Sequence, residues 1–297
     1  VEWPVTLLGE VDNAFSDLPA EVLQASMKEH QKFFSLKNSK TGKIERFITV
    51  ANIEAADNGE TILKGNQKVL YARLSDAKFF WENDIRLIQK DGLDAWLGKL
   101  DDVTFHNKLG SQADKVTRVS TLTKILAKQL LCDIEDAVTS ANICKCDLAS
   151  EMVYEFPELQ GVMGRYYALR AGYSEDVAKV CEEHYAPKGP NDPVPTASIS
   201  VAVSLADKLD TLLGFWTVDE KPTSSKDPFA LRRAALGVIR IILENDVELD
   251  LVEVLNAHFE HLSKFGNHPH AVSDVMNFIR DRFKICLLYT SPSPRDP

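Results

Sequence analysis

The 297-residue sequence lacks the short motifs that mark most self-contained catalytic centres. It has no GxxxxGK(S/T) phosphate loop, no GxGxxG dinucleotide fingerprint, no GxSxG nucleophile elbow and no HExxH zinc helix. It also has no run of about 18 apolar residues, so we expect no transmembrane helix and no membrane partner. We therefore expect no independent catalytic centre on this chain.

Cysteine is scarce and shows no metal-binding pattern. An odd number of scattered cysteines and no signal peptide favour reduced thiols in a cytoplasmic protein. The five are Cys132, Cys144, Cys146, Cys181 and Cys286. Cys144 and Cys146 form one close pair, but two further ligands at zinc spacing are not evident. We expect buried apolar thiols and no metal on this chain.

Basic residues are outnumbered by acidic ones. The formal net charge is -10 and the sequence pI is about 5.3, which argues against a general polyanion binder with a broad basic surface. A local basic patch is compatible with this total. Hydrophobic residues make up 44% of the chain and charged residues 26%, which is ordinary for a globular protein with about two domains.

The stretch from Ile143 to Gly172 combines apolar and acidic residues at helical spacing. Four apolar residues predict a buried stripe on one or two helices: Leu148, Met152, Val153 and Phe156. Asp147, Glu151 and Glu155 follow one another at intervals of four residues and are predicted to share another face. Pro157 breaks the pattern before a second helix.

The run from Ser200 to Trp216 is predicted to be the partner helix of that stretch. It places Asp207 and Asp210 on one side and several leucines on another.

The patterns predict an α+β protein. We expect a mixed α/β piece over 1–64, a mostly helical domain over 65–216, a helical extension over 217–284 and an artefactual or disordered tail over 285–297. Strands are predicted at 1–8 and 44–52, helices at 18–31, 69–85, 93–105, 115–131 and 228–243, and loops at 186–196 and 218–228. Because the sequence starts within strand-like residues and without methionine, we expect a fragment of a longer protein.

Several long stretches, in the same order, resemble the β subunit of the bacterial-type, two-subunit glycyl-tRNA synthetase. They are VEWPVTLLGE, MKEHQKFF, ARLSDAKFFWENDI, FHNKLGS, KCDLASEMVYEFPELQGVMGRYYA, LADKLDTLLGFW and DPFALRRAALGVIRI, within residues 1–284. The resemblance implies an α2β2 assembly with an α subunit, glycine tRNA as a partner, and ATP used at a site on the α subunit. It also implies a C-terminal anticodon-binding domain beyond the present sequence.

The resemblance further implies that the helical domain is a degenerate HD-type domain. HD phosphohydrolases bind metal through an early His, an adjacent His-Asp pair and a later Asp. Here those positions are His106, Cys146-Asp147 and Asp207. Since the paired His is lost, we expect Asp147 and Asp207 to cap or pair within the helical core. The alternative is a metal-dependent nucleotide phosphohydrolase with His106, Asp147 and Asp207 as ligands.

Two clusters are candidates for tRNA contact. Lys28 and Lys32 lie four residues apart on one helical face, where they either contact phosphates or form a solvated face. The neighbouring residues 33 and 34 are both phenylalanine and are predicted to be core residues. Phosphate contact needs only such point charges, so both alternatives stay open for these two lysines.

The second candidate is a basic island from Lys221 to Arg240, where five basic residues oppose one acid, a local balance of +4. Arg232, Arg233 and Arg240 are predicted to form a helical stripe. Their guanidinium groups suit phosphate oxygens, and they equally suit salt bridges within the protein or between subunits. We predict a subunit of glycine–tRNA ligase that binds tRNA and the catalytic α subunit. A purely structural subunit without RNA contact is a third hypothesis.

Overall fold

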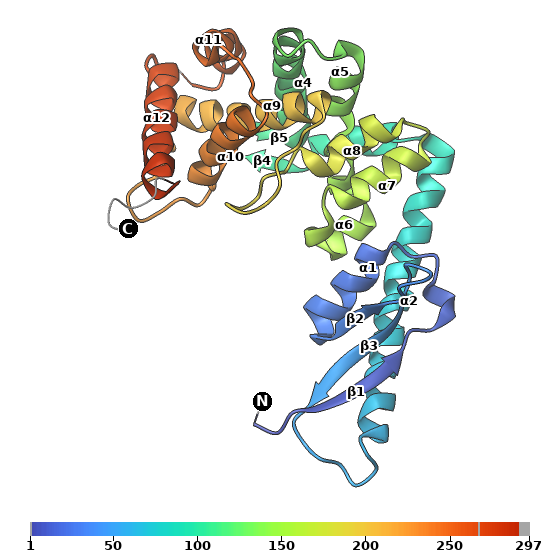
Figure 1. Cartoon of the computed structure of the whole chain (residues 1–297). Coiled ribbons are helices and arrows are strands. Elements are labelled where there is room, and N and C mark those ends of the chain that lie inside the picture. The colour runs from blue at the N-terminus through green and yellow to red at the C-terminus, as the bar shows by residue number, and fades with distance from the viewer. Residues whose placement is uncertain (1, 267, 291–297) are drawn as a thin grey trace.

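The computed structural model describes residues 2–266 and 268–290, with side chains left out of the description at 30 and 286–290. A small sheet lies at one end of the molecule and a body of packed helices at the other, and the long helix α2 (Glu60–Asp91) joins them (Figure 1). The predicted α+β class is confirmed. None of the described helices is both long and apolar enough to cross a membrane.

The N-terminal sheet is antiparallel with the strand order β1-β3-β2. Its strands are β1 (Val5–Glu10), β2 (Phe34–Lys37) and β3 (Ile44–Ala51). The strand predicted at 44–52 is confirmed, the one predicted at 1–8 begins only at Val5, and β2 was not predicted. Phe33, just before β2, is buried and stacks on Phe47 at 4.8 Å between ring centroids. The prediction that residue 34 is also core is wrong. Successive strand residues point to opposite faces, and 62% of Phe34 is exposed on the other face.

Helix α2 is longer than the predicted segment 69–85 and carries a regular buried stripe. Leu70, Leu74, Ala77, Trp81 and Ile88 are buried at intervals of three and four residues or their sum. This spacing keeps one face of a long helix against its neighbours. The preceding helix α1 (Ala20–Ala25) continues as a π-helical turn over Ser26–His30, which agrees with the predicted helix. The domain divisions at 64 and 216 stay predictions; α2 crosses the first of them.

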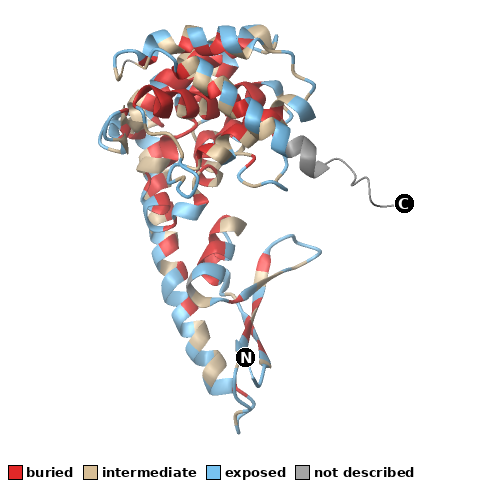
Figure 2. Cartoon of the chain, turned by 90° about the vertical axis from the view of Figure 1, so that its left-hand side faces the viewer, coloured by how far each residue is buried: buried red, intermediate tan, exposed pale blue. Residues whose placement is uncertain are grey.

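Two apolar cores form along the chain. The first joins the sheet, α1 and α2 to the middle helices, and the second surrounds α9 (Figure 2). The other elements are α3 (Asp94–Leu97), β4 (Thr104–His106), β5 (Gly110–Ser111), α4 (Gln112–Gln129), α5 (Ile134–Ile143), α6 (Glu151–Glu155), α7 (Val162–Arg170), α8 (Glu175–Glu183), α9 (Ser198–Thr217), α10 (Leu231–Glu244), α11 (Leu251–Leu262) and α12 (Ala271–Thr290).

Two predictions for the middle of the chain need correction. The predicted helix over 93–105 is instead α3, a 3-10 turn at Gly98–Asp101 and strand β4. Residues 143–172 form four short segments, because Ser150 is extended and caps α6 by accepting a hydrogen bond from the Val153 amide. Asp147 therefore lies on a separate 3-10 turn and shares no helical face with the acids of α6.

The last helix does not end where it was predicted to end. Helix α12 continues to Thr290, so the expected stop at Lys284 is wrong. Residues 291–297 of the predicted tail lie outside the described residues.

The two predicted loops at 186–196 and 218–228 are confirmed, since neither contains a helix or strand.

Candidate functional site

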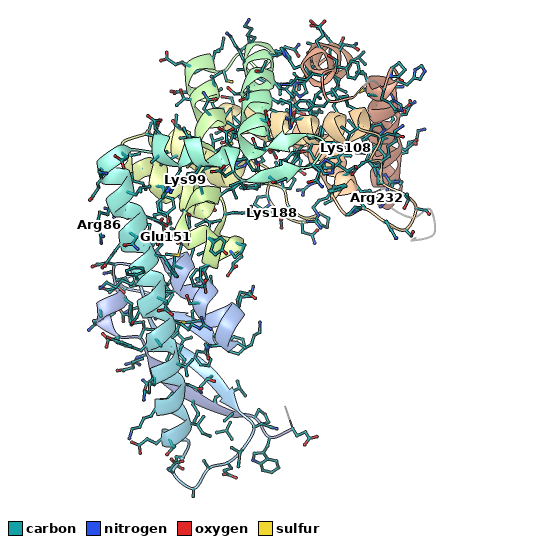
Figure 3. The ribbon with its side chains drawn as sticks, turned by 180° about the vertical axis from the view of Figure 1, so that it is seen from behind. Arg86, Lys99, Lys108, Glu151, Lys188 and Arg232 are labelled. Atoms are coloured by element: carbon teal, nitrogen blue, oxygen red, sulfur yellow. The ribbon has the colours of Figure 1, made fainter. Side chains whose placement is uncertain are left out.

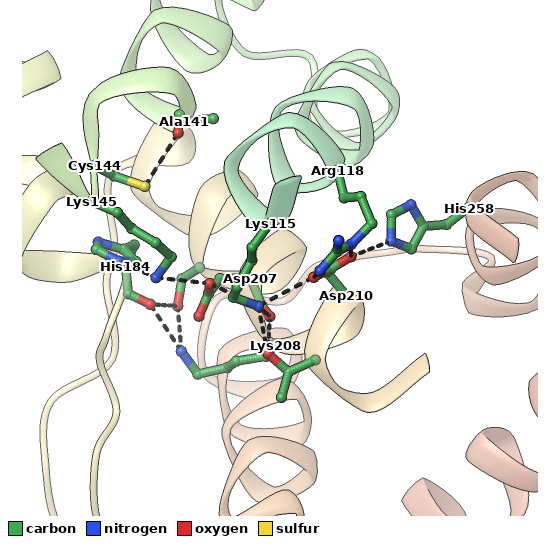
Figure 4. Close-up of polar contacts among 12 residues, drawn as sticks. Lys115, Arg118, Ala141, Cys144, Lys145, His184, Asp207, Lys208, Asp210 and His258 are labelled. Atoms are coloured by element: carbon green, nitrogen blue, oxygen red, sulfur yellow. Dashed lines mark hydrogen bonds and ion pairs between the residues drawn. The ribbon is translucent and has the colours of Figure 1, made fainter. Parts of the chain in front are cut away.

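Helix α9 runs through the middle of the second core and brings three charged residues into it. Asp207, Lys208 and Asp210 follow a largely apolar, buried turn, and none of the three is more than partly exposed. Because a buried charge is unfavourable without partners, each of these side chains needs nearby groups that pair with it or form hydrogen bonds with it. Those groups come from α4, α11 and the segment between α5 and α9 (Figure 4).

Asp210 accepts contacts from three cationic or polar side chains. Arg118 Nε lies 2.8 Å from one carboxylate oxygen and Lys115 Nζ lies 3.2 Å from the other. His258 Nε2 lies 2.9 Å from the oxygen that Arg118 contacts. Burial by itself would raise the pKa of Asp210, but Lys115, His258 and Arg118 outweigh it and hold that pKa below its ordinary value. Asp210 is therefore ionised and fully paired.

Asp207 is held between two lysines. Its Oδ1 lies 3.0 Å from Lys145 Nζ and 3.4 Å from Lys115 Nζ. Lys145 Nζ also lies 3.0 Å from His184 Nε2. Burial and the nearby Lys145 lower the pKa of His184, so the neutral imidazole accepts from Lys145 and donates from Nδ1 to the Val180 carbonyl at 3.0 Å. The ammonium of Lys145 thus occupies the space between His184 and Asp207.

Lys208 has carbonyl and hydroxyl partners and no carboxylate within ion-pair distance among the described residues. Its Nζ donates to the carbonyls of His184 at 3.1 Å and Ala186 at 2.7 Å, and to Ser204 Oγ at 2.8 Å. Burial lowers the pKa of Lys208 to about 8. Gly237 of α10 leaves room for this side chain, since a Cβ there would lie 2.7 Å from Lys208 Cε. Lys208 therefore anchors the backbone between the C-terminal end of α8 and the 186–196 loop.

The three degenerate HD positions do not come together. Asp147 Oδ2 accepts backbone hydrogen bonds from Gly161 at 2.6 Å and Gly164 at 2.9 Å. His106 Nε2 lies 3.1 Å from a carboxylate oxygen of Glu220. Asp207 is paired with lysines, as described above. Over residues 2–266 and 268–290, no three His, Cys, Asp or Glu side chains are grouped as metal ligands would be. No observation favours the phosphohydrolase alternative.

Asp147 provides the first test of these assignments. Asp147→Ala leaves two buried amides without an acceptor and should cost about 2–4 kcal/mol of stability, whereas Asp147→Asn keeps an acceptor and should cost less than about 1 kcal/mol. Burial raises the pKa of Asp147 to about 6 against opposing hydrogen bonds from Gly161 and Gly164. Because the folded state binds this proton more tightly, its stability should fall as pH rises from 3.8 through about 6.

Urea unfolding of the wild type and of Asp147→Asn between pH 3.5 and pH 7, in steps of about 0.5, measures this contribution. The difference between the two proteins isolates Asp147, because the other acids titrate alike in both. The same slope in both proteins would contradict the assignment.

The buried cysteines are confirmed as apolar thiols. Cys144, Cys146 and Cys181 are buried, and burial raises the pKa of each thiol, that of Cys144 to about 12. Cys144 Sγ contacts the Ala141 carbonyl at 3.3 Å. These thiols are protonated at neutral pH and pack as small apolar groups.

The predicted arginine stripe on α10 divides into three different roles. Arg240 donates to the carbonyls of Gly189 at 3.0 Å and Asp192 at 2.8 Å, so it ties α10 to the 186–196 loop. Arg232 contacts the Thr223 carbonyl and lies 3.7 Å from Asp227, which places it at the start of the helix (Figure 3). Arg233 is exposed and has no hydrogen-bond or ion-pair partner within 2–266 and 268–290.

Lys28 and Lys32 lie on the surface beside the sheet. Their side chains are 80% and 77% exposed, and each lies within 3.7 Å of Glu29. The exposed Phe34 contributes to the same cavity wall as both lysines. Whether they contact RNA stays a prediction. The sequence predictions missed Lys115, Lys145 and His184, because their partners lie far away in sequence.

Comparison with known proteins identifies the family. The sequence model of the family described as "Glycyl-tRNA synthetase beta subunit" matches residues 1–292. A glycine–tRNA ligase β subunit of Ruegeria sp. is 59% identical over 97% of this chain and 41% of the relative. The β subunit of Dinoroseobacter shibae is 62% identical over 87% of this chain and 36% of the relative. The β subunit of Paracoccus denitrificans is 57% identical over 97% of this chain and 41% of the relative. The chain spans about two fifths of the length of these curated relatives. The chain belongs to the glycyl-tRNA synthetase β-subunit family.

Proposed function

We propose that this chain is part of a glycyl-tRNA synthetase β subunit that supports the ATP-dependent attachment of glycine to its tRNA in the cytoplasm. It does so by binding tRNA and an α subunit, in an α2β2 assembly whose ATP site lies on the α subunit. The family match over residues 1–292 carries this proposal. Binding energy used to position the tRNA acceptor end lowers the barrier without adding chemical groups.

The buried charges around α9 support an accessory role. Asp207 and Asp210 are each neutralised by lysine or arginine at 2.8–3.4 Å, and Lys145 fills the space in which a cation would otherwise lie. Groups already paired in this way are not free to act on a substrate, and removing one partner would leave the other charge buried and uncompensated. Arg233, by contrast, is exposed and unpaired among the described residues, so it is free to contact a phosphate.

Arg233 is the test residue for tRNA contact. Replacing it by Ala in the full-length β subunit assembled with α should weaken glycine tRNA binding and lower the slope of log affinity against log salt by about 0.7–0.9, the value for one lost phosphate contact. Fluorescence titration over a salt series measures both. Arg232→Ala, Lys28→Ala and Lys32→Ala extend the same test to the other candidates.

Arg240→Ala is the matched control. It removes the same charge from the same helix, but its guanidinium is occupied by Gly189, Asp192 and Glu244. It should lower stability and leave the salt slope unchanged. Equal slopes for the wild type and every variant, with tRNA still bound, would place the RNA surface elsewhere. Loss of α-subunit assembly alone would favour the purely structural role.

A further inference from the structure

A cavity of about 300 Å³ lies between the 186–190 segment, α10 and the end of α12. The apolar part of its lining is made by Pro187, Pro190, Leu236 and Ile285. This part is held in place from behind, because Lys208 fixes the Ala186 carbonyl as described above. A planar, partly apolar group can therefore bind here without the cost of ordering the 186–190 segment.

The same two helices also contribute three arginines to the lining of the cavity, and no acidic residue lines it. Arg233 is unpaired within the described residues, and Arg282 likewise has no hydrogen-bond or ion-pair partner there. The Nε of Arg282 is buried without an acceptor, while its guanidinium lies 5.5 Å from the centre of the Phe278 ring. Arg232, the third, is already partnered by Asp227. Two positive groups thus face one cavity without an anion.

We propose that this cavity binds one unstacked nucleotide of an RNA strand. Its phosphate would lie against Arg233 and Arg282, since guanidinium forks match phosphate oxygens. Its base would pack on the proline and leucine wall, as exposed bases in single-stranded RNA pack on flat apolar or arginine surfaces. The cavity volume is at the small end of the range for ligand sites, about 300–1,000 Å³. This inference rests on the proposed function.

The cavity combines features that an RNA duplex would not need. A duplex backbone presents phosphates over an open surface, so it requires charges and no apolar wall. Here uncharged side chains make the larger share of the lining. An apolar lining beside two guanidinium groups that have no acidic partner favours a flipped or single-stranded nucleotide.

The test uses the full-length β subunit with its α subunit. A 5′-phosphorylated single-stranded RNA tetranucleotide, a 12-base-pair RNA duplex and glycine tRNA are the three probes. Arg233→Gln and Arg282→Gln should each weaken tetranucleotide binding about tenfold, as expected for one charge-assisted hydrogen-bonding group. Leu236→Asn should weaken it several-fold without changing the salt slope, because it alters the base contact alone. Arg282→Lys, which keeps the charge but loses the fork, should restore only part of the affinity.

Arg86→Gln is the control, since Arg86 is also exposed and without a partner among the described residues but lies on α2 away from the cavity (Figure 3). If the wild type binds neither tRNA nor tetranucleotide, the proposed function fails. If it binds both and the cavity variants behave as Arg86→Gln, the nucleotide site is wrong while the function stands. Equal losses for duplex and tetranucleotide, or loss of α-subunit assembly with RNA binding retained, would also overturn the nucleotide site.

Discussion

Asp210→Ala is expected to destabilise the protein by about 3–5 kcal/mol, which is the usual cost of removing one partner from a buried ion pair. The carboxylate is completely buried, and its loss leaves Arg118, Lys115 and His258 in the core without their shared acceptor. The replaced atoms are few, so the large effect would come from uncompensated charge and not from a cavity.

Native-state hydrogen exchange of the α9 amides measures this change within the longer protein. Lys64→Ala is the control, because Lys64 forms an exposed ion pair with Glu60 at 2.6 Å and such pairs contribute less than about 1 kcal/mol. A loss at Asp210 no larger than that of the control would mean that the buried charges are solvated in a way that this geometry does not include.

Gly161→Ala should cost about 2–4 kcal/mol, for two separable reasons. Gly161 has φ +86°, where a side chain adds strain of about 1–2 kcal/mol. A Cβ there would also lie 2.8 Å from the Cys181 carbonyl oxygen, which is backbone and cannot rotate away. The same residue donates its amide to Asp147, so the tight turn and the buried carboxylate depend on one another.

Gly172→Ala separates the two causes. Gly172 has φ +90° but open space around the position of a Cβ, so only the strain should be measured. Thermal or urea unfolding of both variants gives the difference. Equal losses at the two glycines would show that the contact with Cys181 is relieved by movement of the backbone.

Much of the fold could be predicted from local patterns. β-Branched and aromatic residues predicted β3. The helical period predicted α2, α4, α9 and α10, because each of these helices buries one face or is buried all round. The short turns around Ser150 could not be predicted, since the residues from Asp147 to Glu155 fit a continuous helix equally well. What stops that helix is the extended Ser150, whose hydroxyl caps the next segment.

The site could be predicted only in part. The sequence places Asp207 and Asp210 on one helix, but their partners Lys115 and Arg118 lie more than 90 residues earlier. No periodicity in the sequence indicates which basic residue forms an ion pair with which acidic residue. For the same reason the stripe of arginines on α10 was predicted as one set, although Arg240 binds the 186–196 loop and, of the three, only Arg233 is without a partner in the described part of the chain.

Helix α2 has a consequence for how this protein could grip an elongated partner. Its 32 residues form one uninterrupted rod of about 48 Å, at about 1.5 Å per residue. The sheet and helix α1 lie along the N-terminal half of this rod, and the helical body is packed beyond its C-terminal end (Figure 1). Because the rod is uninterrupted, it holds the sheet and the helical body at a fixed separation, and a partner that touches both must be long enough to bridge them.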